Sequence, residues 1–136
     1  MNETGKQFTF SKKERITGAK RIEFLFNQGV SFISYPLRII YLLREQERDA
    51  GCSVLISVPK KRIKKATRRN RIKRLIRESY RLNKKLTNNI RLDGKSLEIA
   101  FIYVKDIESD FFEIQKAVQK ALIKITERIE KKEESE

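Results

Sequence analysis

The residues best suited to chemistry lie between Arg68 and Arg81, in the segment RRNRIKRLIRESYR. This segment holds six arginines and one lysine against a single acidic residue, Glu78. The wider stretch from Lys60 to Lys85 contains fourteen basic residues and the same single acid. Guanidinium and ammonium groups at this density bind phosphates, and each phosphate contact on a nucleic acid releases counterions. The segment therefore indicates a polyanionic partner, with nucleic acid as the first candidate and an anionic membrane as the second.

Residues able to carry out catalysis on the protein itself are scarce. The chain has no histidine and one cysteine, so it lacks the commonest general base and the usual zinc ligands. Its four aspartates, Asp49, Asp93, Asp106 and Asp110, are scattered rather than clustered as a carboxylate metal site for phosphodiester cleavage requires. We therefore expect no catalytic residue and no metal site formed by the protein alone.

The size and charge of the chain narrow the function further. Its 136 residues suit one domain, residues 1–136, in which we expect 1–10 and 131–136 to be frayed tails. The net charge of +14 is larger than solubility requires. The N-terminus has no apolar signal core, no window approaches the roughly 20 apolar residues of a membrane span, and one cysteine makes no internal disulfide. A cytoplasmic protein is expected.

The hydrophobic pattern predicts an α/β sandwich, with helices packed on a mixed sheet. Thr17 suits the N-cap of a first helix, Gly29 its C-terminal cap, and Pro36 an edge or a bulge in the next strand region. Ser109 or Asp110 can cap the last helix. The expected helices cover 17–29, 67–86 and 110 onward, and the expected strands cover 30–43, 52–58 and 97–104.

The basic segment has two faces when it is placed on a helix at 100° per residue. The face expected to pack consists of Ile72, Leu75, Ile76, Ser79 and Asn83. The opposite face consists of Asn70, Lys73, Arg74, Arg77 and Arg81. Stacked cations repel one another in the free protein, and a polyanion would relieve that repulsion. A membrane-surface helix is disfavoured because the segment lacks bulky aromatic anchors.

A longer run around this segment resembles a known family. VPKKRIKKATRRNRIKRLIRESYR, from Val58 to Arg81, resembles the signature region of the bacterial ribonuclease P protein component, whose RNR motif stands here as Arg69, Asn70 and Arg71. FSKKERI and RIEFLFNQG resemble the family's N-terminal segment and first helix, YPLRIIYL its first strand, and LEIAFIYVKD its last. The resemblance covers nearly the whole chain.

The resemblance implies a fold like the second domain of ribosomal protein S5. That fold has a left-handed strand–helix–strand crossover, whereas general statistics make the crossover between Cys52 and Val104 right-handed. The resemblance also implies that the protein joins a catalytic RNA, and that the holoenzyme removes the 5′ leader of precursor tRNA. Catalysis would then belong to the RNA and to Mg²⁺ ions bound mainly by the RNA, as the scarcity of catalytic side chains also indicates.

The resemblance further assigns residues to two RNA contacts. The residues expected to bind the catalytic RNA are Lys60, Lys61, Arg62, Lys64, Lys65, Arg68, Arg69, Asn70, Arg71, Lys73, Arg74, Arg77 and Arg81. Those expected to line a cleft for the precursor leader, between the sheet and the first helix, are Phe10, Arg15, Ile22, Phe26 and Tyr41. Ile22 stands where many relatives have phenylalanine. From its helical position alone, Phe26 is equally well explained as a core residue.

Two other functions remain open at this point. A ribosomal or RNA-chaperone protein with a structural role fits the composition and charge equally well. A sequence-specific DNA-binding protein fits less well, because the basic segment has few of the short polar side chains that read base edges. The expected partners are therefore the catalytic RNA and the precursor tRNA leader, with no membrane and no DNA.

Overall fold

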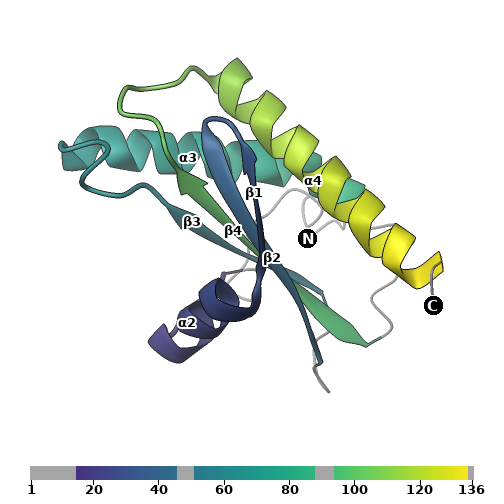
Figure 1. Cartoon of the computed structure of the whole chain (residues 1–136). Coiled ribbons are helices and arrows are strands. Elements are labelled where there is room, and N and C mark those ends of the chain that lie inside the picture. The colour runs from purple at the N-terminus through teal and green to yellow at the C-terminus, as the bar shows by residue number, and fades with distance from the viewer. Residues whose placement is uncertain (1–14, 46–50, 88–93, 135–136) are drawn as a thin grey trace, which may run out of the picture.

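The computed structural model describes residues 15–45, 51–87 and 94–134, which form one mixed sheet with helices on both faces (Figure 1). Helices α3 and α4 cover one face of the sheet, and the short helix α2 covers part of the other. In chain order the elements are α2 (Ala19–Gln28), β1 (Val30–Ser34), β2 (Leu37–Glu45), β3 (Cys52–Ser57), α3 (Ala66–Asn83), the 3₁₀ helix η2 (Lys84–Thr87), β4 (Lys95–Tyr103) and α4 (Phe111–Glu134).

The four strands have the order β1-β2-β4-β3. The region expected as one long or broken strand is a hairpin, in which Ser34 of β1 pairs with Leu37 of β2 across a turn at Tyr35 and Pro36. Strand β2 runs antiparallel to β4. Strands β3 and β4 are parallel and adjacent, and α3 forms the connection between them. The predicted parallel pair and the predicted mixed sheet are both confirmed.

The larger core lies between the sheet and helices α3 and α4. Alternate residues of β4, Leu97, Ile99, Phe101 and Tyr103, are fully buried there, because successive strand residues point to opposite faces. Helix α3 contributes Ile72 and Ile76 as predicted. Tyr80, which the sequence analysis did not place in the core, is 1% exposed, whereas Leu75 is only partly buried. The buried face of α4 consists of Ile114, Ala117, Val118, Ala121, Leu122, Ile125 and Ile129.

The smaller core lies under α2 and consists of Ile16, Leu25, Ile40 and Ala100. The predicted N-cap at Thr17 is wrong: Gly18 is the N-cap, with a φ of 94° that favours glycine, and α2 has no side-chain cap. Gly29 does end the helix, but its backbone is extended. A Cβ there would lie 2.5 Å from Ile40 Cγ2, so close packing against β2 explains the glycine.

The ends of the chain differ from the expectation in one respect. Helix α4 continues to Glu134, so the segment expected to fray from residue 131 is helical as far as that residue. The predicted N-terminal tail, residues 1–10, lies outside the described residues. No helix in the described part of the chain is long and apolar enough to span a membrane.

Candidate RNA-binding surface

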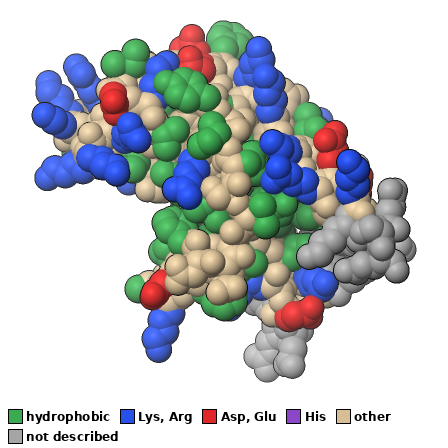
Figure 2. Space-filling model, viewed as in Figure 1, with side chains coloured by type: hydrophobic (Ala, Val, Ile, Leu, Met, Phe, Trp, Pro, Cys, Tyr) green, Lys and Arg blue, Asp and Glu red, His purple; other side chains and the backbone are tan. Residues whose placement is uncertain are grey.

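The outer face of α3 presents the basic segment to solvent. Burial of Ile72, Ile76 and Tyr80 fixes the rotation of the helix, which leaves Arg71 and Arg74 exposed. Among the described residues, neither arginine makes an ion pair with an acid. Figure 2 shows Lys and Arg side chains gathered over the end of the molecule where β3 leads into α3. Of the predicted outer face, the structure places Asn70 and Arg74 outward, and Arg68 and Arg71 are exposed beside them, whereas Lys73, Arg77 and Arg81 are half-buried.

Arg69, the first residue of the RNR motif, supports the basic loop. Its Nη1 donates hydrogen bonds to the carbonyl oxygens of Ile63 at 3.1 Å and Lys64 at 2.6 Å. Ile63 is 5% exposed, and its N–H donates to the Pro59 carbonyl. These bonds shape the loop that presents Lys60, Lys61, Lys64 and Lys65 as exposed cations. Arg69 is half-buried, and its guanidinium uses Nη1 to hold this loop through these two hydrogen bonds.

Arg81, at the other end of α3, is paired with Glu78. The Arg81 Nε donates to Glu78 Oε2 at 3.0 Å, and Arg81 Nη2 donates to Glu78 Oε1. This hydrogen bonding lowers the pKa of Glu78 and raises the pKa of Arg81. Lys73, Arg77 and Arg81 are half-buried, so positive charge is most accessible at the N-terminal end of the helix. That end has neither a side-chain cap nor an acidic residue in its first turn.

A cavity of about 680 Å³ lies beside the N-terminal end of α3. One wall is basic and comes from the loop before α3, and the other comes from the loop after β4. The Arg62 Nη1 and Asp106 Oδ1 atoms, 3.2 Å apart, join the two walls. The cavity is lined by Lys61, Arg62, Ile63, Lys64, Lys65, Arg68, Asp106, Ile107 and Glu108.

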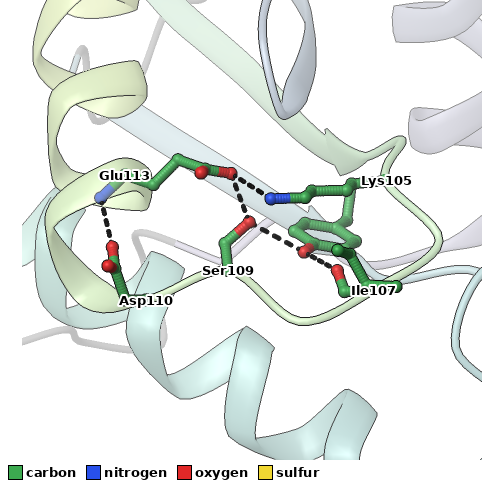
Figure 3. A network of polar contacts seen from close by, with 6 residues as sticks. Lys105, Ile107, Ser109, Asp110 and Glu113 are labelled. Atoms are coloured by element: carbon green, nitrogen blue, oxygen red, sulfur yellow. Dashed lines mark hydrogen bonds and ion pairs between the residues drawn. The ribbon is translucent and has the colours of Figure 1, made fainter.

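A polar network holds the loop after β4 (Figure 3). The Tyr103 hydroxyl donates to the Ile107 carbonyl and lies 2.9 Å from Ser109 Oγ. Glu113 Oε1 accepts from Ser109 Oγ at 2.6 Å and from Lys105 Nζ at 2.8 Å. Burial raises the pKa of Tyr103, while the hydrogen bond from Lys105, and then that from Ser109, lower the pKa of Glu113. The network fixes residues 105–109 against α4.

The same network tests the predicted cap of the last helix. The Glu113 N–H donates to Asp110 Oδ1 at 2.8 Å, so Asp110 satisfies a backbone donor of the first helical turn. Ser109 bonds the side chain of Glu113 instead. The prediction that one of these two residues caps α4 is confirmed for Asp110.

The residues expected to line a leader cleft are only partly brought together. Ile22 is half-buried beside the smaller core, and Phe26 on the same helix is 44% exposed, which makes the core explanation of Phe26 wrong. Arg15 is exposed and pairs through its backbone with Val54. Tyr41 lies on the opposite face of the sheet, 8% exposed in the larger core, because β2 alternates between faces. The placement of Tyr41 in this cleft is therefore wrong.

Phe10, the remaining residue of that set, lies outside the described residues.

The face that carries α2 also holds a row of side chains that the register places side by side. Ile33 of β1 pairs with Arg38 of β2, and Arg38 pairs with Ile102 of β4. Ile33 is 59% exposed, Arg38 is exposed and Ile102 is half-buried. The part of the sheet that α2 does not cover is therefore exposed, and it carries both apolar and basic side chains.

A buried carboxylate on this face was not anticipated from the sequence. Glu98 in the middle of β4 is 1% exposed, and its Oε2 accepts from Arg21 Nε of α2 at 2.5 Å and lies 3.7 Å from Arg44 Nη1 of β2. The Arg44 guanidinium also lies over the Phe24 ring, 4.7 Å from its centroid. Among the described residues, Glu98 Oε1 has no hydrogen-bond partner. In the sequence, the sign of this buried ion pair was a single acidic residue, Glu98, inside the apolar run LEIAFIYV.

The described residues contain no group of three or more His, Cys, Asp or Glu side chains placed to hold a metal ion. Several acidic side chains instead pair with arginine or lysine, as Glu78, Glu98 and Glu113 do. What this part of the chain offers chemically is therefore positive charge, exposed aromatic surface and a cavity with one basic wall.

Comparison with known proteins gives a consistent result. A family model described as Ribonuclease P matches residues 10–126. The ribonuclease P protein component of Porphyromonas gingivalis is 44% identical over 119 residues, which cover 87% of each chain. The Staphylococcus aureus RNase P protein has a TM-score of 0.63 and 25% identity, covering 85% of this chain and 97% of that one. The Thermotoga maritima RNase P protein has the same TM-score and 27% identity, covering 82% and 96%.

Proposed function

The chain belongs to the ribonuclease P protein family, and on that premise we propose that it binds the catalytic RNA of the enzyme and the 5′ leader of precursor tRNA. In this role the protein promotes hydrolysis of the phosphodiester bond that joins the leader to the mature tRNA. Family membership makes it the protein component of a tRNA-processing endoribonuclease. The two RNA contacts and the division of labour with the RNA are the parts that we propose.

The observation that carries the proposal is the outer face of α3. Arg71 and Arg74 are exposed and make no ion pair among the described residues, and the first helical turn, which carries Arg68 and Arg69, contains no acid. Arg68 and Arg69 lie at the positive end of the helix dipole, where each cation is unfavourable in the free protein by up to roughly 1 kcal/mol. RNA phosphates at this end would reverse that unfavourable term and release counterions.

The proposed leader contact is on the face that carries α2. Phe26 is an exposed aromatic side chain on α2, and aromatic rings stack on unpaired bases with little sequence preference. The open row Ile33, Arg38 and Ile102 offers apolar surface and one cation on the same face. A single-stranded leader suits such a surface, because its bases are free to stack and its phosphates to pair with a guanidinium group.

The chemical step is proposed to belong to the RNA and to Mg²⁺ held mainly by RNA phosphates. Magnesium supplies charge neutralisation and a metal-activated water when it is bound there. The protein contributes binding and orientation. Its clustered cations let RNA strands approach one another at lower magnesium concentration, since they replace part of the counterion charge.

The test is a processing assay with the full-length chain, a bacterial ribonuclease P RNA and a precursor tRNA at low magnesium. We expect cleavage at the mature 5′ end that depends on added protein. Binding to the RNA without stimulated cleavage would contradict the proposal and favour a structural RNA-binding role.

A variant of the α3 face sharpens this test. Arg71→Ala with Arg74→Ala should weaken assembly with the catalytic RNA and lower the slope of log affinity against log salt by about two, one for each lost phosphate contact. Lys116→Ala with Lys120→Ala, on the exposed side of α4, removes the same charge and serves as the control. Equal losses in both double variants would show that only net charge matters.

A further inference from the structure

The cavity beside α3 differs from the rest of the basic surface because one of its walls carries acids. Lys61, Lys64, Lys65 and Arg68 face Asp106 and Glu108 across a space of about 680 Å³. A surface that only neutralises a phosphate backbone would be weakened by carboxylates at this point. The two acids therefore require an explanation of their own.

The acidic wall is held in a fixed position. Tyr103 donates to the Ile107 carbonyl, and the Ser109, Glu113 and Lys105 contacts tie the same loop to α4 (Figure 3). Between the two acids, the Ile107 side chain is 66% exposed at the cavity. An apolar side chain flanked by two carboxylates can contact the face of a nucleobase while the carboxylates accept hydrogen bonds from its edge.

We propose that this cavity binds one unpaired nucleotide of an RNA partner whose base carries an exocyclic amino group. The nucleotide phosphate contacts Lys64, Lys65 and Arg68, the base face contacts Ile107, and the amino group donates to Asp106 or Glu108. The cavity volume falls in the range of about 300–1,000 Å³ typical of small-ligand sites. This proposal deepens the proposed function and rests on it for the identity of the partner.

A simpler explanation of the two acids predicts the opposite change in RNA affinity when they are removed. If Asp106 and Glu108 only moderate the charge of the loop, removing both acids should tighten RNA binding. Holding the loop does not explain Asp106 either, because its side chain is 73% exposed and exposed ion pairs such as Arg62–Asp106 contribute little to stability. A specific role in base recognition predicts weaker binding despite the higher net charge.

The first experiment compares two double variants that each remove two negative charges. Asp106→Asn with Glu108→Gln should weaken binding about tenfold, since a good base-edge contact discriminates on the order of tenfold. Glu127→Gln with Glu130→Gln, both exposed on α4, should leave binding unchanged or tighter. Binding by the cavity variant that matches or exceeds the control would overturn the proposal. If the double variant disturbs the loop, the comparison is repeated with Glu108→Gln alone, which keeps the Arg62–Asp106 pair.

The RNA that supplies the nucleotide is identified by two arms of this experiment. The affinity of the full chain for ribonuclease P RNA reports on a nucleotide of the catalytic RNA. The affinity of the preassembled holoenzyme for precursor tRNA reports on a nucleotide of the substrate. A loss in either arm supports the cavity and names the source, and a loss in neither arm overturns it.

A second experiment does not depend on ribonuclease P activity. The free protein is titrated with GMP, CMP, AMP and UMP while the backbone amide signals of residues 106–108 are followed by NMR. We expect those signals to shift with a severalfold lower dissociation constant for the three amino-bearing nucleotides than for UMP. Equal responses to all four would show phosphate binding alone and overturn the base contact, whatever the processing assay shows.

Discussion

The two faces of the sheet are built differently. Among the residues that the structure describes, the face under α3 and α4 buries a cluster of twenty apolar residues, whereas the face under α2 buries four. Polar groups also differ between them. On the α2 face, the carboxylate of Glu98 is buried with Arg21 and Arg44 around it, while the polar network of the other side lies at its rim, at the N-terminus of α4.

This difference indicates that the face under α3 and α4 mainly stabilises the fold, and that the face under α2 is available to bind a partner. A large apolar interface provides most of the hydrophobic free energy of folding. The α2 face buries fewer apolar residues among those described, and it leaves Phe26 and the row through Arg38 exposed. A face that is only partly covered can bind a partner without losing the fold, because the core on the other side stays intact.

The largest effect is expected in the larger core. Phe101→Ala removes a fully buried ring from the central strand and should lower the free energy of unfolding by about 3–5 kcal/mol. Ile102→Ala, the next residue on the opposite face, is half-buried and should cost about 1 kcal/mol. Urea denaturation followed by circular dichroism measures both. Similar losses would contradict the division between the two faces.

An intermediate effect is expected from Glu98. Glu98→Ala leaves two arginines without their shared carboxylate and should cost about 1–3 kcal/mol. The loss should be concentrated in α2, so hydrogen exchange of α2 amides should accelerate more than exchange of α3 amides. Glu45→Ala is the control, since Glu45 is exposed and its Oε1 lies 3.7 Å from Lys95 Nζ. Uniform acceleration across α2 and α3 would show that Glu98 supports the whole fold instead.

A smaller effect, on binding rather than folding, is expected from Phe26. Phe26→Ala should weaken the holoenzyme's preference for precursor over mature tRNA by about 1–2 kcal/mol, the loss of one stacked base. Phe24→Ala is a matched control: it is 45% exposed against 44%, and two residues of helix rotation place it on the other flank of α2. An equal loss of preference in the two variants would remove Phe26 from the leader contact.

The smallest effect is expected in the acid stability of the network at α4. The hydrogen bond from Lys105 lowers the pKa of Glu113 from its ordinary value of 4.5. Its contribution to stability is therefore complete above that value and is lost as the pH falls through the lower, folded-state pKa. Glu113→Gln should lower stability slightly near neutral pH and reduce the slope of stability against pH below about 4.5. An unchanged acid slope would show that Glu113 contributes nothing measurable.

Much of the helical structure followed from local spacing. The inward positions of α4, from Ile114 to Ile129, and the buried Ile72 and Ile76 of α3 repeat at helical intervals, so the sequence predicted them. The errors arose where the spacing of residues does not determine which face of the sheet a side chain occupies. Tyr41 and Ile40 are neighbours in β2, so strand alternation places them on opposite faces, but it does not tell which helix covers each face.

Residue types and short-range spacing were enough to establish a strongly basic chain without histidine, the two faces of α3 and the long apolar stripe of α4. These depend on residue types and on contacts within a few turns of one helix. Only the packing of the whole chain brings Glu98 to Arg21, and Arg62 to Asp106 beside the cavity. The partners in these pairs are 77 and 44 residues apart, so strand order and helix packing had to bring them together.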